Sequence, residues 1–139
     1  MDPRDRWIAW AQSIVGQPFE WGRTDCWTLT VQAIDLALGT KLARRYRGRW
    51  RNEEEARAYA EACGETAADV LREIGAREIP PAFAARGDVL EREQDGLPCV
   101  APVVGRLALI SAPGHAVMLV PLARLDLDGW RAWRLPWAS

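Results

Sequence analysis

A cysteine that directly follows an aspartate, at the start of an apolar helical pattern, is the strongest chemical signal in this sequence. Asp25 is a residue type that caps helices, so Cys26 is expected in the first helical turn. The positive end of the helix dipole favours a thiolate there, and free backbone N–H groups can hold an oxyanion. Cys26 is therefore a candidate nucleophile for acyl transfer. The alternative is a small buried cysteine without reactivity.

Two further cysteines and one histidine complete the set of potential metal ligands. Cys63, Cys99 and His115 could form a zinc site with Cys26 by number, but the sequence has no C-x₂₋₄-C spacing, which structural zinc sites usually contain. An odd number of cysteines without close pairs also argues against a disulfide framework. We therefore expect no metal and no other cofactor.

Length and composition indicate one globular domain spanning residues 1–139. Hydrophobic residues make up 49% of the chain, and its net charge of −1 excludes a general electrostatic attraction to nucleic acid. No apolar stretch reaches the roughly 18–20 residues of a membrane span, and no signal peptide is visible at the N-terminus. The chain is thus expected to be synthesised in the cytoplasm and not to be exported by a signal peptide.

Helical patterns fill the first half of the sequence. Helix starts are indicated at Asp2-Pro3, Asp25, Asn52 and Thr66, and the corresponding ends at Gly16, Gly39, Gly64 and Gly75. The segment 41–51 between the second and third helices holds six basic residues and no acidic ones. We interpret it as a solvated loop, with a contact patch for an acidic or phosphate-bearing partner as the alternative.

The hydrophobic period changes from helical to alternating after residue 87. Strands are predicted at residues 87–91, 100–104, 106–112, 115–120 and 130–135. Helices followed by a run of antiparallel strands predict an α+β fold in which N-terminal helices pack on a small antiparallel sheet.

The region around the candidate nucleophile resembles the NlpC/p60 family of papain-like cell-wall hydrolases. Residues 16–22 read G-Q-P-F-E-W-G and precede Asp25-Cys26, whereas the family typically reads G-x-P-Y-x-W-G and then D-C-S-G-L. Residues 87–90, G-D-V-L, resemble the start of a family strand. The resemblance extends from residue 16 to about residue 120, and it implies a papain-like NlpC/p60-type fold with Cys26 as the nucleophile.

The same resemblance indicates a degenerate catalytic site. The family's next strand begins with the catalytic histidine, and a polar residue, often histidine, follows near the end of the strand after that. In this register Cys99 takes the base position and Ser111 the orienting position. Neither side chain can replace an imidazole as a base near neutral pH. Trp27 replaces the small serine after the nucleophile, and we expect it to crowd the cleft.

His115 is the alternative base. It opens an apolar stretch similar to the family's histidine strand, but it follows Asp88 by 27 residues (115 − 88), an unusually long interval for the family. With His115 as base, Asp126 and Asp128 are the nearest downstream carboxylates for the third position, and the sequence does not choose between them. The other interpretation of His115 is a residue at the edge of a turn beside Gly114.

The compact form and the Trp-rich tail at residues 130–134 resemble small NlpC/p60-like proteins encoded among phage tail genes. This resemblance implies a structural or assembly component of the virion, at or near the tail tip, with other tail proteins as partners. An active cysteine peptidase or amidase, which would cut host peptidoglycan while DNA enters the cell, is the alternative. A cytosolic binding or immunity-type module is a third interpretation. The eight tryptophans suit either interface anchors or a core.

Overall fold

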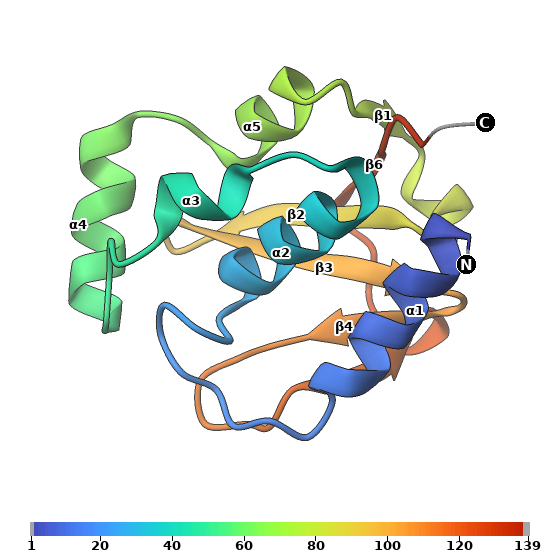
Figure 1. Cartoon of the computed structure of the whole chain (residues 1–139), viewed down its shortest axis with the longest axis horizontal. Helices are drawn as coiled ribbons and strands as arrows, with labels where there is room; N and C mark the ends of the chain where they lie inside the picture. The colour runs from blue at the N-terminus through green and yellow to red at the C-terminus, as the bar shows by residue number, and fades with distance from the viewer. Residues whose placement is uncertain (1, 138–139) are drawn as a thin grey trace.

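The computed structural model describes residues 2–137 and shows an α+β fold (Figure 1). The helices come first in the described chain, as the sequence predicts, and the strands follow. The helices are α1 (Pro3–Ile14), α2 (Cys26–Leu38), α3 (Leu42–Tyr46), α4 (Glu53–Cys63) and α5 (Ala67–Glu73). The strands are β1 (Arg77–Ile79), β2 (Asp88–Gln94), β3 (Leu97–Val104), β4 (Leu107–Ile110), β5 (Met118–Pro121) and β6 (Arg131–Arg134).

The six strands form one antiparallel sheet in the order β1-β6-β2-β3-β4-β5. Helix α2 packs against β3, and α1 packs beside α2 on the same side of the sheet (Figure 1). The longest strands, β2 and β3, are joined by a tight turn at Asp95-Gly96, where both residues have positive φ. Asp-Gly is a favoured sequence for such a hairpin turn.

Several element boundaries differ from the sequence prediction. The predicted strand at residues 115–120 begins only at Met118, because residues 113–115 form a turn. The first strand, β1, was not predicted, and it pairs with β6, which follows it by more than 50 residues near the C-terminus. Such pairing over a long sequence separation leaves little local signal, since strand preference depends on the neighbouring strand.

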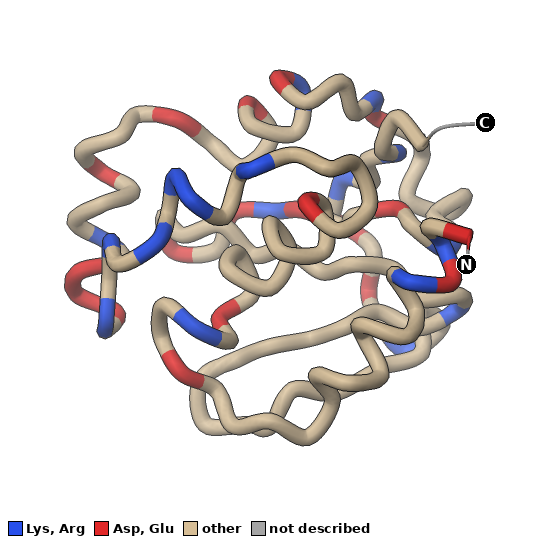
Figure 2. The backbone as a smooth tube through the Cα atoms, in the orientation of Figure 1, with Lys and Arg blue, Asp and Glu red and all other residues tan. Residues whose placement is uncertain are grey.

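The basic segment 41–51 is only partly the solvated loop that the sequence predicts. It contains α3, and Leu42, Tyr46 and Trp50 are buried. Its basic residues are exposed and lie along α3 and the chain after it, next to the acidic start of α4 (Figure 2). The apolar residues of this segment thus belong to the core. The sequence did not predict this, because the basic residues around them favour a solvated loop.

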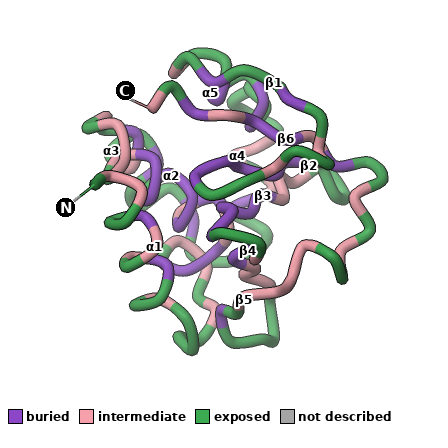
Figure 3. Tube along the Cα trace, turned by 90° about the vertical axis from the view of Figure 1, so that its right-hand side faces the viewer, coloured by how far each residue is buried: buried purple, intermediate pink, exposed green. Residues whose placement is uncertain are grey.

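Most of the tryptophans are buried inside the molecule. Trp7, Trp27, Trp50, Trp130 and Trp133 are buried, and the buried residues follow the central strands and the helices packed on them (Figure 3). Trp137 packs edge-on against Trp7, with ring centroids 5.6 Å apart. The C-terminal tail therefore contributes to the core and does not present a row of exposed aromatic anchors.

Two ion pairs attach β6 to β2. The buried carboxylate of Glu91 accepts bonds of 2.9 Å from the guanidinium of Arg131 and from Trp133 Nε1. The buried carboxylate of Asp88 forms an ion pair with the guanidinium of Arg134, with a distance of 3.0 Å between Oδ2 and Nη2. Within residues 2–137, no helix combines the length and apolar character needed to cross a membrane.

Candidate functional site

The candidate site is built around the start of α2, where Asp25 and Cys26 lie. Asp25 is the N-cap: its carboxylate accepts a bond of 2.9 Å from the backbone N–H of Thr28. It also accepts bonds from the Thr28 hydroxyl at 2.9 Å, from Gly22 N–H at 2.6 Å and from Trp50 Nε1 at 3.0 Å. Asp25 therefore joins three segments of the chain and fixes the position of the cysteine that follows it.

The loop before α2 depends on a glycine. Gly22 has a φ of +81°, in the left-handed region that favours glycine, and a Cβ there would lie 2.4 Å from the carbonyl oxygen of Trp50. The close approach allows the Trp50 indole to reach Asp25. The last glycine of the G-x-P-F-x-W-G pattern, Gly22, is thus required by this close approach to Trp50.

Ser111 ties the end of the β4 region to this loop. Its hydroxyl donates to the carbonyl oxygen of Thr24, and the Thr24 hydroxyl donates to Pro18 O at 2.8 Å. The backbone N–H of Glu20 donates to the Thr24 hydroxyl at 2.7 Å. Ser111 lies in the lining of the pocket that contains Cys26, but its hydroxyl is engaged in holding the loop.

The thiol of Cys26 is partly buried and points at the start of β3. Its Sγ donates to the carbonyl oxygen of Pro98 at 3.5 Å. Burial raises the pKa of the thiol from 9.0 to about 12, and the nearby Cys99 and Asp25 add to the increase. Hydrogen bonds from the backbone of Val100 and Trp27 oppose it without cancelling it. At neutral pH the thiol is therefore protonated, and the thiolate required of a nucleophile is scarce.

Cys99, in β3, lies near the thiol of Cys26 and lines the same pocket. It packs with Leu90, Ala101 and Trp130 in a separate apolar cluster. The residue paired with Cys99 across the β2–β3 ladder is Arg92. The guanidinium carbon of Arg92 lies over the ring of Trp130, 4.4 Å from the ring centroid. Cys99 thus lies near Cys26, as the register predicts, and its side chain also packs with this apolar cluster.

His115 and the two downstream aspartates lie outside the pocket lining. His115 is exposed in the turn after β4, where its backbone N–H donates to Ala112 O at 3.2 Å. Asp126 and Asp128 are exposed in the segment before β6 and bond to each other, Asp128 N–H to Asp126 Oδ1 at 3.0 Å. Within residues 2–137, no three His, Cys, Asp or Glu side chains are placed to hold a metal ion.

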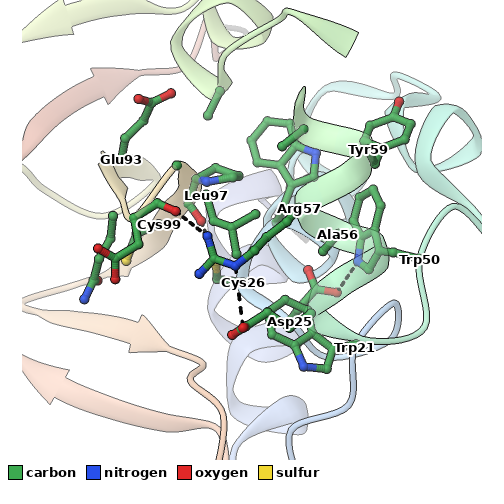
Figure 4. A pocket seen from close by; sticks show the side chains of 18 of the residues that line it. Trp21, Asp25, Cys26, Trp50, Ala56, Arg57, Tyr59, Glu93, Leu97 and Cys99 are labelled. Carbon is green, nitrogen blue, oxygen red and sulfur yellow. Dashed lines mark hydrogen bonds and ion pairs between the residues drawn. The ribbon is translucent and has the colours of Figure 1, made fainter. Parts of the chain in front are cut away.

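A pocket of about 360 Å³ includes Cys26 in its lining. One wall is α4, which contributes Glu53, Arg57 and Tyr59, and another is the tip of the β2–β3 hairpin at residues 93–97. The Arg57 side chain crosses the pocket from α4 in front of Cys26 (Figure 4). The pocket is thus an open space between a helix and a hairpin, with the thiol at its base.

Arg57 connects the two walls. Its Nη1 donates to the carbonyl oxygen of Asp95 at the hairpin turn, and its Nε lies 3.5 Å from the carboxylate of Glu53. Trp27, which the sequence predicts to crowd the cleft, lines the pocket but is buried, and its ring centroid lies 5.5 Å from that of Tyr46 in an edge-on arrangement. It forms part of the inner wall.

Sequence reasoning missed Arg57, Trp50 and Glu93 as members of this site. The Asp95-Gly96 turn was a usable signal for the hairpin that carries Glu93. Nothing local in the sequence places Arg57 or Trp50 near Cys26, because each comes from a different part of the chain and reaches the pocket only in the fold.

The chain matches a known protein family. The model of a family described as "Domain of unknown function (DUF6950)" matches residues 2–135. No curated protein and no solved structure matches the chain.

Proposed function

The chain belongs to the DUF6950 family, and from this premise we propose that it is a non-hydrolytic structural component of a phage tail. In this proposal the scaffold is NlpC/p60-like, the location is the virion at or near the tail tip, and the partners are other tail proteins. The pocket at Cys26 is a degenerate catalytic site that has kept its position in the fold.

The observation that carries the proposal is the environment of the thiol. Hydrolysis of an amide by a cysteine requires a base that removes the thiol proton and a group that orients the base. No imidazole lines the pocket among residues 2–137, and the single histidine of the sequence is exposed in a turn outside it. Burial leaves the Cys26 thiol protonated, with a pKa of about 12.

Two features support an NlpC/p60-like scaffold. A cysteine begins a helix that packs on an antiparallel sheet, and its sulfur contacts the first residues of β3. In the resembling family, that strand carries the base. The motif at residues 16–26 and the short chain with its Trp-rich end support a phage-tail protein by resemblance alone.

Peptidoglycan digestion tests the loss of catalysis. The purified chain and its Cys26→Ala variant are incubated with peptidoglycan sacculi, and the released peptides are measured by mass spectrometry beside an active NlpC/p60 hydrolase. We expect no release from either chain. Release by the natural chain that disappears in Cys26→Ala would overturn the proposal in favour of a peptidase or amidase that acts while DNA enters the cell.

Particle composition tests the location. Phage particles purified from cells that carry this gene are probed with an antibody to the chain, and the same is done for particles made with Cys26→Ala. We expect the chain in the particles, at the tail, with unchanged infectivity for the variant. Its presence in the cytosol alone would instead indicate a binding or immunity-type module.

A further inference from the structure

We propose that the Cys26 pocket binds a basic segment of a partner polypeptide, taking its Arg or Lys side chains between α4 and the β2–β3 hairpin. This inference rests on the proposed non-hydrolytic function, because it assigns a binding role to the same pocket. Three properties of the pocket support it: its charge, its aromatic surface and the position of Arg57.

The charge of the pocket is strongly negative. Four exposed carboxylates line it, and Arg57 is the only basic residue among the described lining residues. The four are Glu53, Glu65, Glu93 and Asp95. They come from α4, from the segment after it and from the hairpin, so they surround the pocket from several sides. An anionic ligand would be repelled, whereas a cationic side chain would be attracted.

The walls between these carboxylates are aromatic. Trp21 packs edge-on against Phe19, with ring centroids 4.9 Å apart. The ring centroids of Trp50 and Tyr59 are 5.2 Å apart. All four rings line the pocket. Aromatic faces attract cations, and they also cover the apolar stem of an Arg or Lys side chain. The volume of about 360 Å³ suits one or two side chains of a peptide and not a folded domain.

Arg57 shows how a guanidinium is held in this space. It contacts the carboxylate of Glu53 on α4 and the carbonyl oxygen of Asp95 in the hairpin at the same time. An arginine from a partner would find the same acceptors once Arg57 moves aside. Arg57 is therefore an internal competitor, and its removal should expose the acceptors and leave the pocket more negative.

Calorimetric titration of the purified full-length chain tests the inference. The probe is the blocked peptide acetyl-Ala-Arg-Leu-Arg-Ala-amide, and the matched control is acetyl-Ala-Glu-Leu-Glu-Ala-amide. We expect binding of the basic peptide only, with affinity that decreases as salt rises, because exposed charges are screened. Binding of the acidic peptide, or equal binding of both, would overturn the inference.

Variants locate the binding to the pocket. Glu93→Gln and Glu65→Gln should each weaken binding by about two- to five-fold, the range of an exposed ion pair. Glu54→Gln should leave it unchanged, because Glu54 is exposed on α4 and does not line the pocket. Arg57→Ala should strengthen binding. Loss of binding in Arg57→Ala would identify Arg57 as a ligand contact and overturn the inference.

The outcomes separate this inference from the proposed function. No binding of the basic peptide, in a chain that also releases nothing from peptidoglycan and is present in particles, would overturn the inference and leave the function standing. Hydrolysis of peptidoglycan would overturn the function whatever the titration shows. Concentration-dependent self-association in sedimentation that Glu93→Gln abolishes would identify a second copy as the occupant and overturn the partner assignment.

Discussion

The Cys26 thiol is subject to two opposing effects. Its place at the start of α2 favours the thiolate, but a helix terminus contributes only about 0.3–1 kcal/mol at an exposed site, less than one pKa unit. Burial acts in the other direction and raises the pKa from 9.0 to about 12. Desolvation therefore prevails, and the residue that the sequence suggests as a nucleophile is held as a neutral thiol.

Alkylation by iodoacetamide should report this environment. At pH 7.5 the exposed Cys63 should react well before Cys26, because Cys26 is both less accessible and almost entirely protonated. The rate at Cys26 should keep increasing with pH up to about 12. Peptide mass spectrometry of partly alkylated chains measures both rates.

Two controls accompany the alkylation. The Cys63→Ser variant leaves Cys26 to be followed without competition at that site, and the unfolded chain shows the reactivity of each thiol without burial. Faster reaction at Cys26 than at Cys63 near neutral pH would show an activated thiolate and contradict the degenerate site.

At the scale of elements, α2 depends on tertiary partners for its start. Asp25 caps the helix as the sequence predicts, but the same carboxylate also accepts bonds from Gly22 and from the Trp50 indole. Those donors belong to the preceding loop and to the segment between α3 and α4. The cap is consequently the point at which the pocket wall, the loop and the helix are joined.

Asp25→Ala should destabilise the fold more than removal of an ordinary cap does. Loss of an N-cap costs about 1 kcal/mol, and the part-buried N–H of Gly22 and the buried Nε1 of Trp50, left without partners, add to it, so we expect about 3–5 kcal/mol in total. Urea unfolding followed by circular dichroism measures the difference in the free energy of unfolding.

Asn52→Ala is the matched control for this prediction. Asn52 caps α4 through one bond of 2.8 Å from Glu55 N–H and is exposed. Its loss should cost about 1 kcal/mol. Equal effects of the two substitutions would show that the additional bonds of Asp25 contribute nothing measurable.

For the whole molecule, the alkaline pH dependence of stability follows from Cys26. Between pH 9 and 12 the unfolded chain loses the thiol proton while the folded chain keeps it, so the unfolded state binds fewer protons. The contribution of the Cys26 thiol to the free energy of unfolding is fully present below pH 9 and is lost as pH rises towards 12.

Cys26→Ala should therefore show a shallower loss of stability over this range than the natural chain. Burial also raises the pKa of Tyr46, which adds a slope of the same sign, but that slope is common to both chains. Thermal unfolding at pH steps from 8 to 11 measures the two slopes. Parallel slopes for Cys26→Ala and the natural chain would contradict the raised pKa of Cys26.

The sequence by itself determined the features that depend on neighbouring residues. Helix starts at Asp25, Asn52 and Thr66 were predicted correctly, because a cap and the N–H groups it accepts from lie within one turn. The change to an alternating pattern after residue 87 predicted the strands and with them the α+β class. The family register brought Cys26, Cys99 and Ser111 to one part of the fold, and all three line the pocket.

Only the tertiary structure decided the chemistry of the site. Whether a thiol is buried, and on which face of β3 the Cys99 side chain lies, depends on packing and strand register and not on residue type. Arg57, Trp50 and the hairpin carboxylates reach the pocket from elements far apart in the sequence. Electrostatic balance in a pocket is the sum over such residues, so the negative charge around Arg57 could be recognised only after the chain was folded.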